Sequence, residues 1–392
     1  MSLIISVPVK PISLYIHWPY CLSLCPYCDF NSHVQNSIDH DAWLIAYEKE
    51  IEYFADKIKG REVRSIFFGG GTPSLMKPHL VEAIIEKIGK FGQISNNTEI
   101  TLEANPTSYE TQKFKEFKLA GVNRVSIGVQ SLQQEALTML GRKHSANEAV
   151  KAIESAAKIY DRYSFDLIYA IPGQTLDEWQ KEIIQALKLA RGHISLYQLT
   201  IEKGTPFYRL YRNGDLKMPS NDLAASMYEW TNDHLQTQGY KRYEISNYAK
   251  IGDECVHNLC YWNYNEYIGI GPGAHSRLHQ SDGVLAIMMT HKPEKWLESV
   301  TNNGHGIQSN NKLSKQEAVE EMIMMGTRLE EGIHEEDFFK MTGCKFTEIF
   351  NNKTLNHYIQ QGLVIIHNGQ LRFSNKGLML HNYLLSRMLS DN

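Results

Sequence analysis

Residues 13–33 read SLYIHWPYCLSLCPYCDFNSH, an apolar, aromatic-rich run that is followed at once by three cysteines. Cys21, Cys25 and Cys28 make up half of the six cysteines of this 392-residue chain. Six cysteines in a chain of this length do not form a disulfide scaffold, and such clustering indicates metal or redox chemistry. The stretch therefore predicts a strand that delivers a cysteine loop to a functional site.

The spacing of these cysteines leaves two kinds of metal centre open. Three thiolates can wrap one face of an iron–sulfur cubane, which has four irons, so that one iron stays without a protein ligand. The alternative is a zinc site with His17 or His33 as the fourth ligand. The remaining cysteines are isolated, and we expect them to be small buried residues: Cys255, Cys260 and Cys344.

Strand and helix patterns alternate through the first half of the chain. Helical periodicity covers 41–60, 77–92, 109–121 and 176–192. The strands are expected at 13–18, 65–69, 99–104, 124–129, 164–169 and 194–200. Six strand–helix units predict a parallel sheet, either doubly wound or an open barrel. Polar or glycine-rich groups follow nearly every strand, as the site residues of barrel enzymes do, so we predict an α/β fold with a partial (β/α)6 barrel.

The pattern changes after about residue 250. Residues 252–277 are rich in glycine, asparagine and aromatic side chains and give few helical cues. Helical patterns return from about 290, and 362–377 reads as a hairpin around an Asn-Gly turn. We therefore predict a barrel domain over 1–250, a connecting segment over 251–290 and a smaller α+β, winged-helix-like C-terminal domain over 291–392.

Composition excludes several classes of protein. Forty basic residues against 44 acidic ones give a net charge of −4, so we expect no nucleic-acid partner. No apolar run approaches the roughly 18 residues of a membrane span, and no secretory signal is visible. We expect a cytoplasmic protein.

The chain resembles the radical S-adenosylmethionine (radical SAM) superfamily, whose CxxxCxxC signature matches CLSLCPYC at 21–28. GGGTPS, LEANP, AGVNRVSIGVQS and DLIYAIPGQT are similar to the branch that contains oxygen-independent coproporphyrinogen III oxidase. Within that branch the closer resemblance is to haem chaperones. It implies a [4Fe-4S] cluster on the three cysteines, with S-adenosylmethionine as ligand of the open iron.

The resemblance also implies which other residues contact S-adenosylmethionine, and it assigns no catalytic residue. Arg142 suits the carboxylate of that ligand and Asp166 suits its ribose diol. Each such residue taken alone could equally be a strand-end hydrogen bond or a surface charge. The implied set is Tyr15, Tyr27, Gly70, Gly71, Thr72, Glu103, Gln130, Arg142 and Asp166.

A second landmark is HNLCYW at 257–262, which matches the HNxxYW motif of the chaperone group. The resemblance implies haem contact by His257, Asn258, Tyr261 and Trp262. Imidazole can ligate haem iron and aromatic faces can pack on a porphyrin. Read from the residues alone, the segment is a capped turn with two core aromatics. His257 as axial ligand, His257 as a supporting residue and Cys255 as a competing thiolate ligand all stay open.

Three functions follow from these observations. The first is a haem chaperone that passes haem to acceptor apoproteins; the resemblance implies a homodimer and contact with membrane-bound respiratory proteins. The second is a radical oxidase acting on a porphyrinogen. The oxidase has a further cysteine at the position of Phe30, which argues against this function. The third is a zinc-stabilised protein without radical chemistry.

Overall fold

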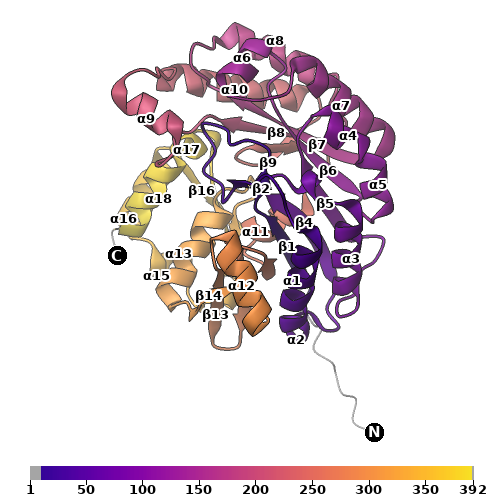
Figure 1. The fold of residues 1–392 in the computed structure, drawn as a ribbon. Coiled ribbons are helices and arrows are strands. Elements are labelled where there is room, and N and C mark those ends of the chain that lie inside the picture. Colours follow the sequence, from indigo (N-terminus) through magenta and orange to yellow (C-terminus); the bar gives the residue numbers. More distant parts are fainter. Residues whose placement is uncertain (1–9, 391–392) are drawn as a thin grey trace.

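The computed structural model describes residues 10–390. Six parallel strands form its centre, each followed by helical cover on the outside (Figure 1). They are β1 (Ile12–Trp18), β4 (Val63–Gly70), β5 (Glu99–Ala104), β6 (Arg124–Gln130), β7 (Arg162–Tyr169) and β8 (His193–Gln198). Each strand pairs with the next one along the chain, whereas a doubly wound sheet reverses its order. The predicted partial (β/α)6 barrel is therefore confirmed.

Helices cover the outer face of these strands because each carries one apolar side. The helices are α1 (His40–Tyr53), α3 (Pro78–Gly89), α5 (Phe114–Leu119), α7 (Ala146–Ile159) and α8 (Leu176–Leu187). In α7 the buried residues recur at spacings of three and four, and Ser145 with Glu148 forms a capping box at its start. The sequence predicted four of these helices within a few residues, since helical periodicity is a local signal, but it gave no prediction for α7.

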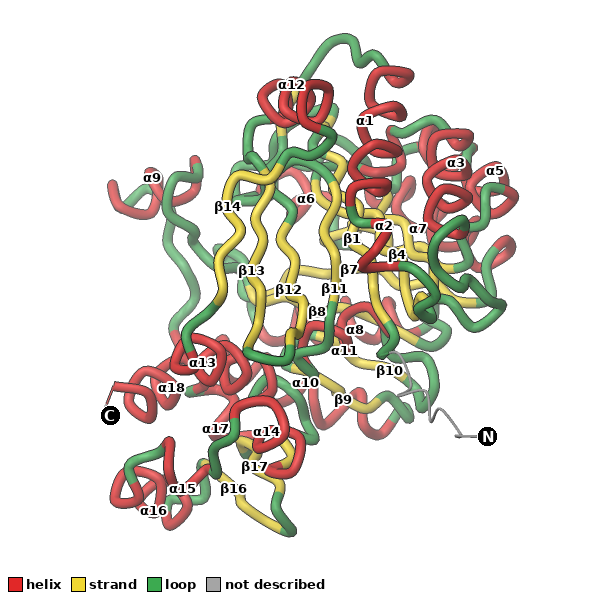
Figure 2. Tube along the Cα trace, turned by 90° about the horizontal axis from the view of Figure 1, so that it is seen from below, coloured by secondary structure: helices red, strands yellow, loops and turns green. Residues whose placement is uncertain are grey.

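Further strands extend the sheet beyond the barrel at both ends. β11 (Tyr267–Ile270) pairs in parallel with β1, and the antiparallel strands β12 (His275–Gln280), β13 (Gly283–Met289) and β14 (Ile307–Lys312) continue outward (Figure 2). At the other end, β10 (Asn247–Ala249) and β9 (Lys241–Glu244) follow β8. The whole sheet has 12 strands in the described residues.

The segment with few helical cues contains a short helix, α11 (Val256–Trp262). The carboxylate of Glu99 accepts hydrogen bonds from the backbone N–H groups of Val256 and His257, both at 3.2 Å. These donors at the first turn of a helix otherwise lack partners. A residue 157 positions away therefore stabilises the helix, which is why local sequence did not reveal it.

The C-terminal unit has its own hydrophobic core and a small sheet. The hairpin of β16 (Val364–His367) and β17 (Gln370–Phe373) turns at Asn368 and Gly369, both with positive φ as an Asn-Gly turn requires. The short β15 (Ile333–His334) pairs with β17, and α13 (Lys315–Gly326), α14 (Glu335–Thr342), α16 (Asn352–Gln360) and α18 (His381–Ser390) pack around this sheet. The predicted α+β character is confirmed.

The predicted divisions at residues 250 and 290 stay predictions. α12 (Pro293–Asn303) lies against α1, and its Trp296 and Val300 belong to the larger core of the barrel. Tyr264 and Val284 belong instead to the core of the C-terminal unit. No helix within residues 10–390 combines the length and apolar character needed to cross a membrane.

Candidate functional site

The cysteine loop lies over the C-terminal ends of the parallel strands. Cys21 ends the two-residue strand β2 (Tyr20–Cys21), which pairs with β3 (His33–Val34) and so closes the loop. The three thiols are free and half-buried, and all three line one pocket. The backbone N–H of Cys28 donates to the carbonyl of Cys25 at 3.1 Å, which folds the loop onto itself.

Two donors from the barrel point at the sulfur atoms. The hydroxyl of Thr72 lies 3.3 Å from Sγ of Cys21, and Nη1 of Arg142 lies 3.3 Å from Sγ of Cys25. Burial raises the pKa of Cys21 to about 11 and also raises that of Cys28. The ligand form of cysteine is the thiolate, so binding of a metal centre has to displace these protons.

The structure gathers no single-ion site around this loop. Within residues 10–390, no three side chains of histidine, cysteine, aspartate or glutamate converge on one metal position. The ring of His17 is engaged on both sides, by the Tyr15 hydroxyl at 3.1 Å and the Asn31 carbonyl at 2.9 Å. Three thiols on one loop can each bind a different iron of an iron–sulfur cluster.

Most of the residues implied for S-adenosylmethionine line the same pocket as the cysteines. They come from the cysteine loop, from the four successive strands β4 to β7 and from the segments that follow these strands: Tyr27, Gly70, Gly71, Thr72, Glu103, Gln130, Arg142 and Asp166. Gln130 has φ of 69°, which is unusual for a residue other than glycine and typical of functional sites. The structure thus brings together groups that lie up to 145 positions apart in the sequence.

Arg142 connects the members of this pocket. Its Nη2 donates to Oδ1 of Asn105 at 2.6 Å and to the carbonyl of Gly128 at 2.7 Å. Asn105 in turn donates to the Thr72 hydroxyl at 3.0 Å. A chain of hydrogen bonds therefore joins the two cysteine-contacting side chains. The sequence placed Asn105 after a strand but did not include it among the site residues.

Residues 69–71 are glycines because β1 and the segment that follows it approach their backbone closely. A Cβ on Gly70 would lie 2.5 Å from the ring of His17, and Gly70 has φ of +111°. A Cβ on Gly71 would lie 2.7 Å from the backbone oxygen of Tyr20. Only glycine fits at such positions. These residues place the backbone of β4 directly beside the cysteine loop.

Two carboxyl groups in the pocket have raised pKa values. Burial, together with the charge of Asp166, raises the pKa of Glu103 to about 8. Burial raises the pKa of Asp166 to about 6. The N–H of Gly70 donates to Glu103 at 3.2 Å and partly offsets the cost of its charge. A cationic ligand beside this pair would favour both charged forms.

Tyr15 and Tyr261 line a second cavity rather than the cysteine pocket. This cavity shares Phe30, Gly70 and Glu103 with the cysteine pocket, so the two are neighbours. Phe30 is 65% exposed. The predicted contact between Tyr15 and the cofactor stays a prediction.

The residues of HNLCYW do not converge on one cavity, because they lie on a helix. His257 and Tyr261 are four residues apart and face the barrel interior, where Nε2 of His257 meets the Tyr261 hydroxyl at 2.8 Å. Trp262 faces the other way, into a groove beside the C-terminal unit. Asn258 donates to the hydroxyl of Tyr243 at 3.3 Å. One motif therefore serves two parts of the molecule.

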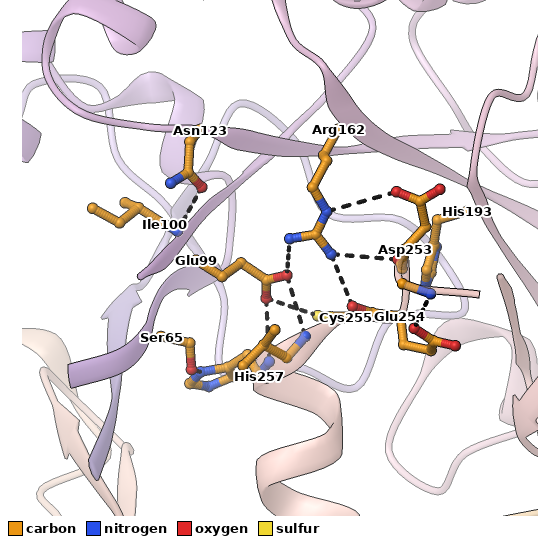
Figure 3. Close-up of polar contacts among 12 residues, drawn as sticks. Ser65, Glu99, Ile100, Asn123, Arg162, His193, Asp253, Glu254, Cys255 and His257 are labelled. Atoms are coloured by element: carbon orange, nitrogen blue, oxygen red, sulfur yellow. Dashed lines mark hydrogen bonds and ion pairs between the residues drawn. The ribbon is translucent and has the colours of Figure 1, made fainter. Parts of the chain in front are cut away.

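His257 is fully engaged within the protein, as Figure 3 shows for its contact with Ser65. Nδ1 lies 2.8 Å from the Ser65 hydroxyl, Nε2 is bonded to Tyr261, and the residue is 1% exposed. Burial lowers the pKa of His257 to about 3, so the ring is neutral. Cys255 is equally buried, and its thiol donates to Glu99 at 3.4 Å. Within the described residues, neither side chain lines the cysteine pocket, the neighbouring cavity or the groove beside the C-terminal unit, so haem ligation by either would first require these bonds to break.

Sequence reasoning missed a charged layer at the opposite end of the barrel. Glu99 forms an ion pair with Arg162 at 2.9 Å, and Arg162 also donates to the carbonyl of Glu254 at 2.8 Å (Figure 3). Burial opposes the charge of Glu99, but Arg124, Arg162 and the α11 backbone outweigh burial and lower its pKa. The available signal was a charged residue at the first position of three successive strands, β5 to β7.

Comparison with known families identifies two regions of the chain. The profile of the "Radical SAM superfamily" matches residues 15–213, and that of the "HemN C-terminal domain" matches 313–380. The first region contains the cysteine loop, most of β1 and the other five parallel strands. The second covers most of the C-terminal unit.

Relatives with similar sequences align along nearly the whole chain. "Heme chaperone HemW" of Haemophilus influenzae is 36% identical over 391 residues, which cover 98% of this chain and 99% of that protein. HemW of Escherichia coli is 35% identical, with 98% and 100% covered. "Radical S-adenosyl methionine domain-containing protein 1, mitochondrial" of Danio rerio is 38% identical, with 97% and 87% covered.

A solved structure has the same fold. Coproporphyrinogen III oxidase (HemN) from Escherichia coli, described as a radical SAM enzyme, superposes with a TM-score of 0.82 over 98% of this chain and 91% of that one. The sequences are 20% identical, so this likeness concerns the architecture.

Proposed function

Because the chain belongs to the HemW family of the radical SAM superfamily, we propose that it binds a [4Fe-4S] cluster, S-adenosylmethionine and haem and delivers haem to acceptor apoproteins. The family implies the cluster and S-adenosylmethionine. Haem comes from the names of the bacterial relatives. Full-length alignment at 35–36% identity with those relatives is the observation that favours a chaperone.

In this proposal Cys21, Cys25 and Cys28 bind the cluster, which together with S-adenosylmethionine supplies one-electron chemistry when bound. Thr72 and Arg142 donate to two of the sulfur atoms and stabilise them as thiolates. The donor set therefore fits the group. Glu103 and Asp166 supply negative charge across the pocket from the loop, where a sulfonium or ammonium group would be stabilised.

A radical oxidase acting on coproporphyrinogen is the alternative, because HemN, which shares this fold, is named for that activity. Phe30 stands where that enzyme has an additional cysteine, at the boundary between the two neighbouring cavities. An aromatic side chain there cannot act as a thiol does in redox or radical steps. This difference makes haem delivery the preferred function.

The test combines haem transfer with a decarboxylation assay. The protein is reconstituted with iron and sulfide without oxygen, loaded with haem, and mixed with apomyoglobin, whose Soret band reports transfer. We expect transfer by the wild type and no decarboxylation of coproporphyrinogen III. Decarboxylation without haem binding would establish the oxidase instead.

A Cys21/Cys25/Cys28 triple-alanine variant tests the role of the cluster in that assay. We expect slower transfer or loss of dimerisation, because the cluster orders the loop that closes the pocket. Unchanged transfer and unchanged oligomeric state would show that the cluster has no part in delivery. We also propose a homodimer that acts in the cytoplasm and contacts membrane-bound haem proteins peripherally; size-exclusion chromatography and fractionation of cells test these two points.

A further inference from the structure

A large groove separates the barrel from the C-terminal unit, at the end of the barrel opposite the cysteines. Its volume is about 680 Å³, within the range of roughly 300–1,000 Å³ that small-molecule sites occupy. One wall consists of the starts of β1 and β4 and the outer face of α11, and the other comes from α13, β15 and α14. β1 has seven residues, so this end lies about 20 Å from the cysteine loop.

Part of each wall of the groove is apolar or aromatic, beside polar side chains. Leu259 and Trp262 of α11 face Met322 of α13 and Ile333 of β15 across it. The guanidinium of Arg328 covers the Trp262 ring at 4.4 Å from its centroid, which fixes the orientation of the indole. Nε1 of Trp262 is buried and has no hydrogen-bond partner among the described residues. A flat apolar ligand would find a preformed surface here.

Two basic side chains at one side of the groove are available for a ligand. Lys10 and Arg64 line it, and neither forms an ion pair with any residue in the range 10–390. Of the acidic residues of the groove, Glu266 pairs with Arg61 at 2.8 Å, whereas Asp337 lies 3.7 Å from Lys340, which also pairs with Glu336 at 2.8 Å. The lining carries three basic side chains, Lys10, Arg64 and Lys340, against two acidic ones, so its net charge is positive and matches a ligand with carboxylates.

We infer that the haem carried by this protein lies in the groove, with its porphyrin against Trp262 and Leu259 and its propionates toward Lys10 and Arg64. This inference rests on the proposed function and says where in the molecule haem binds. The wall also carries imidazole and thioether groups that can ligate iron, from His279, His334, Met322 and Met341. His257 then acts through the helix: it anchors α11 from the inside, and Trp262 contacts haem from the outside.

The assignment is tested by haem titration of anaerobically reconstituted full-length protein, with the Soret band as readout. Trp262→Ala and the double variant Lys10→Glu/Arg64→Glu should each raise the apparent Kd at least tenfold. Cluster absorbance and S-adenosylmethionine binding should not change, because the groove and the cysteine pocket share no residue.

Matched controls separate this effect from general damage. Trp230→Ala removes another half-buried indole, on α10 (Asn221–Thr237), and Lys151→Glu/Arg209→Glu reverses two exposed charges elsewhere. Both controls should bind haem as the wild type does. The charge variants concern surface residues, so they keep the test valid if Trp262→Ala fails to fold.

Each result has a distinct meaning. Wild-type affinity in both groove variants would overturn the assignment, as would a loss of haem binding in His257→Ala at an unchanged unfolding midpoint. Absence of stoichiometric haem binding by the wild type would reject the proposed function itself. Weakened binding in the groove variants alone establishes the site.

Discussion

Glu99 and Glu103 lie four residues apart on the same face of β5, yet their surroundings give them opposite properties. Glu99 is 2% exposed and is bound by Arg162 and by two backbone N–H groups of α11, and its pKa is lowered. Glu103 lines the cysteine pocket, accepts one N–H at 3.2 Å, and has its pKa raised to about 8. A buried carboxylate with all partners present is structural, whereas one with few partners is ready for a ligand.

The same contrast holds for the two ends of the barrel. The end of the barrel that contacts α11 contains glutamate, arginine, histidine and cysteine, which are the residue types of an active site. These side chains, however, bind one another or the backbone. The end at the cysteine loop also has internal hydrogen bonds, through Arg142, but its polar groups line an open pocket. Residue type alone therefore does not identify the functional end of this barrel.

The largest expected effect comes from Glu99→Ala. This change removes the negative charge that offsets buried Arg124, breaks the ion pair with half-buried Arg162 and frees the first turn of α11, so we expect a loss of about 3–5 kcal/mol in the free energy of unfolding. Urea denaturation followed by circular dichroism measures it. Glu103→Ala is the matched control and should cost clearly less. Equal losses in the two variants would show that Glu103 contributes to stability as much as Glu99 does.

Acid should destabilise the fold through the buried end. His257 has a folded pKa of about 3 against about 6.5 when unfolded, so the unfolded state binds the proton first. Stability is then lost as pH falls below about 6.5, by about 2 kcal/mol at pH 5 from this residue. Urea midpoints at pH 7.5 and pH 5 measure the effect.

His257→Gln retains polar contacts without a titrating ring and is the control for this pH dependence. Its midpoint should change less between the two pH values than that of the wild type. An identical pH dependence in the variant would show that other groups, such as His17, whose pKa burial lowers to about 4, account for the acid sensitivity.

The open end should show a pH dependence of the same sign, but in ligand binding and at higher pH. Glu103 is protonated below about pH 8 and becomes charged when a cationic ligand binds, so the affinity for S-adenosylmethionine should rise with pH. The limit is about tenfold per pH unit, with a plateau above pH 8. Isothermal titration calorimetry of the reconstituted protein measures it, and Glu103→Gln should flatten the profile. A flat wild-type profile would contradict the role assigned to Glu103.

The smallest effect is expected from Phe30→Ala. Phe30 is 65% exposed, so its removal should change the free energy of unfolding by less than about 0.5 kcal/mol. Thermal unfolding monitored by circular dichroism is sufficient. A large loss of stability would mean that the open end contributes to the fold as the α11 end does.

Local patterns revealed most of the fold. The six strands and the covering helices have periodicities of two and 3.6 residues, which are visible in any window of sequence. The Asn368-Gly369 turn was equally local. Among the elements without a prediction were α7, α11 and the strands that follow α11; for α11 the reason is that Glu99 stabilises the helix from another part of the chain.

The candidate site was predicted only in part. The cysteines and the strand-end residues lie together because parallel strands place their C-terminal ends at one edge, which topology alone requires. The sequence could not show that Asn105 connects Arg142 to Thr72, or that HNLCYW divides between two faces of a helix. It also could not show the groove, whose walls come from segments more than 300 residues apart.

By itself, the sequence determined the barrel, the cysteine loop and the family, since these depend on spacing along the chain. Tertiary structure decided what each polar residue does. One hydrogen-bond partner of His257 is Ser65, 192 positions away, and this contact makes the imidazole structural. Trp262, five residues further along the chain, faces a groove instead. Whether a buried polar group has hydrogen-bond partners depends on its neighbours in space, and these partners determine the free energy of burying it.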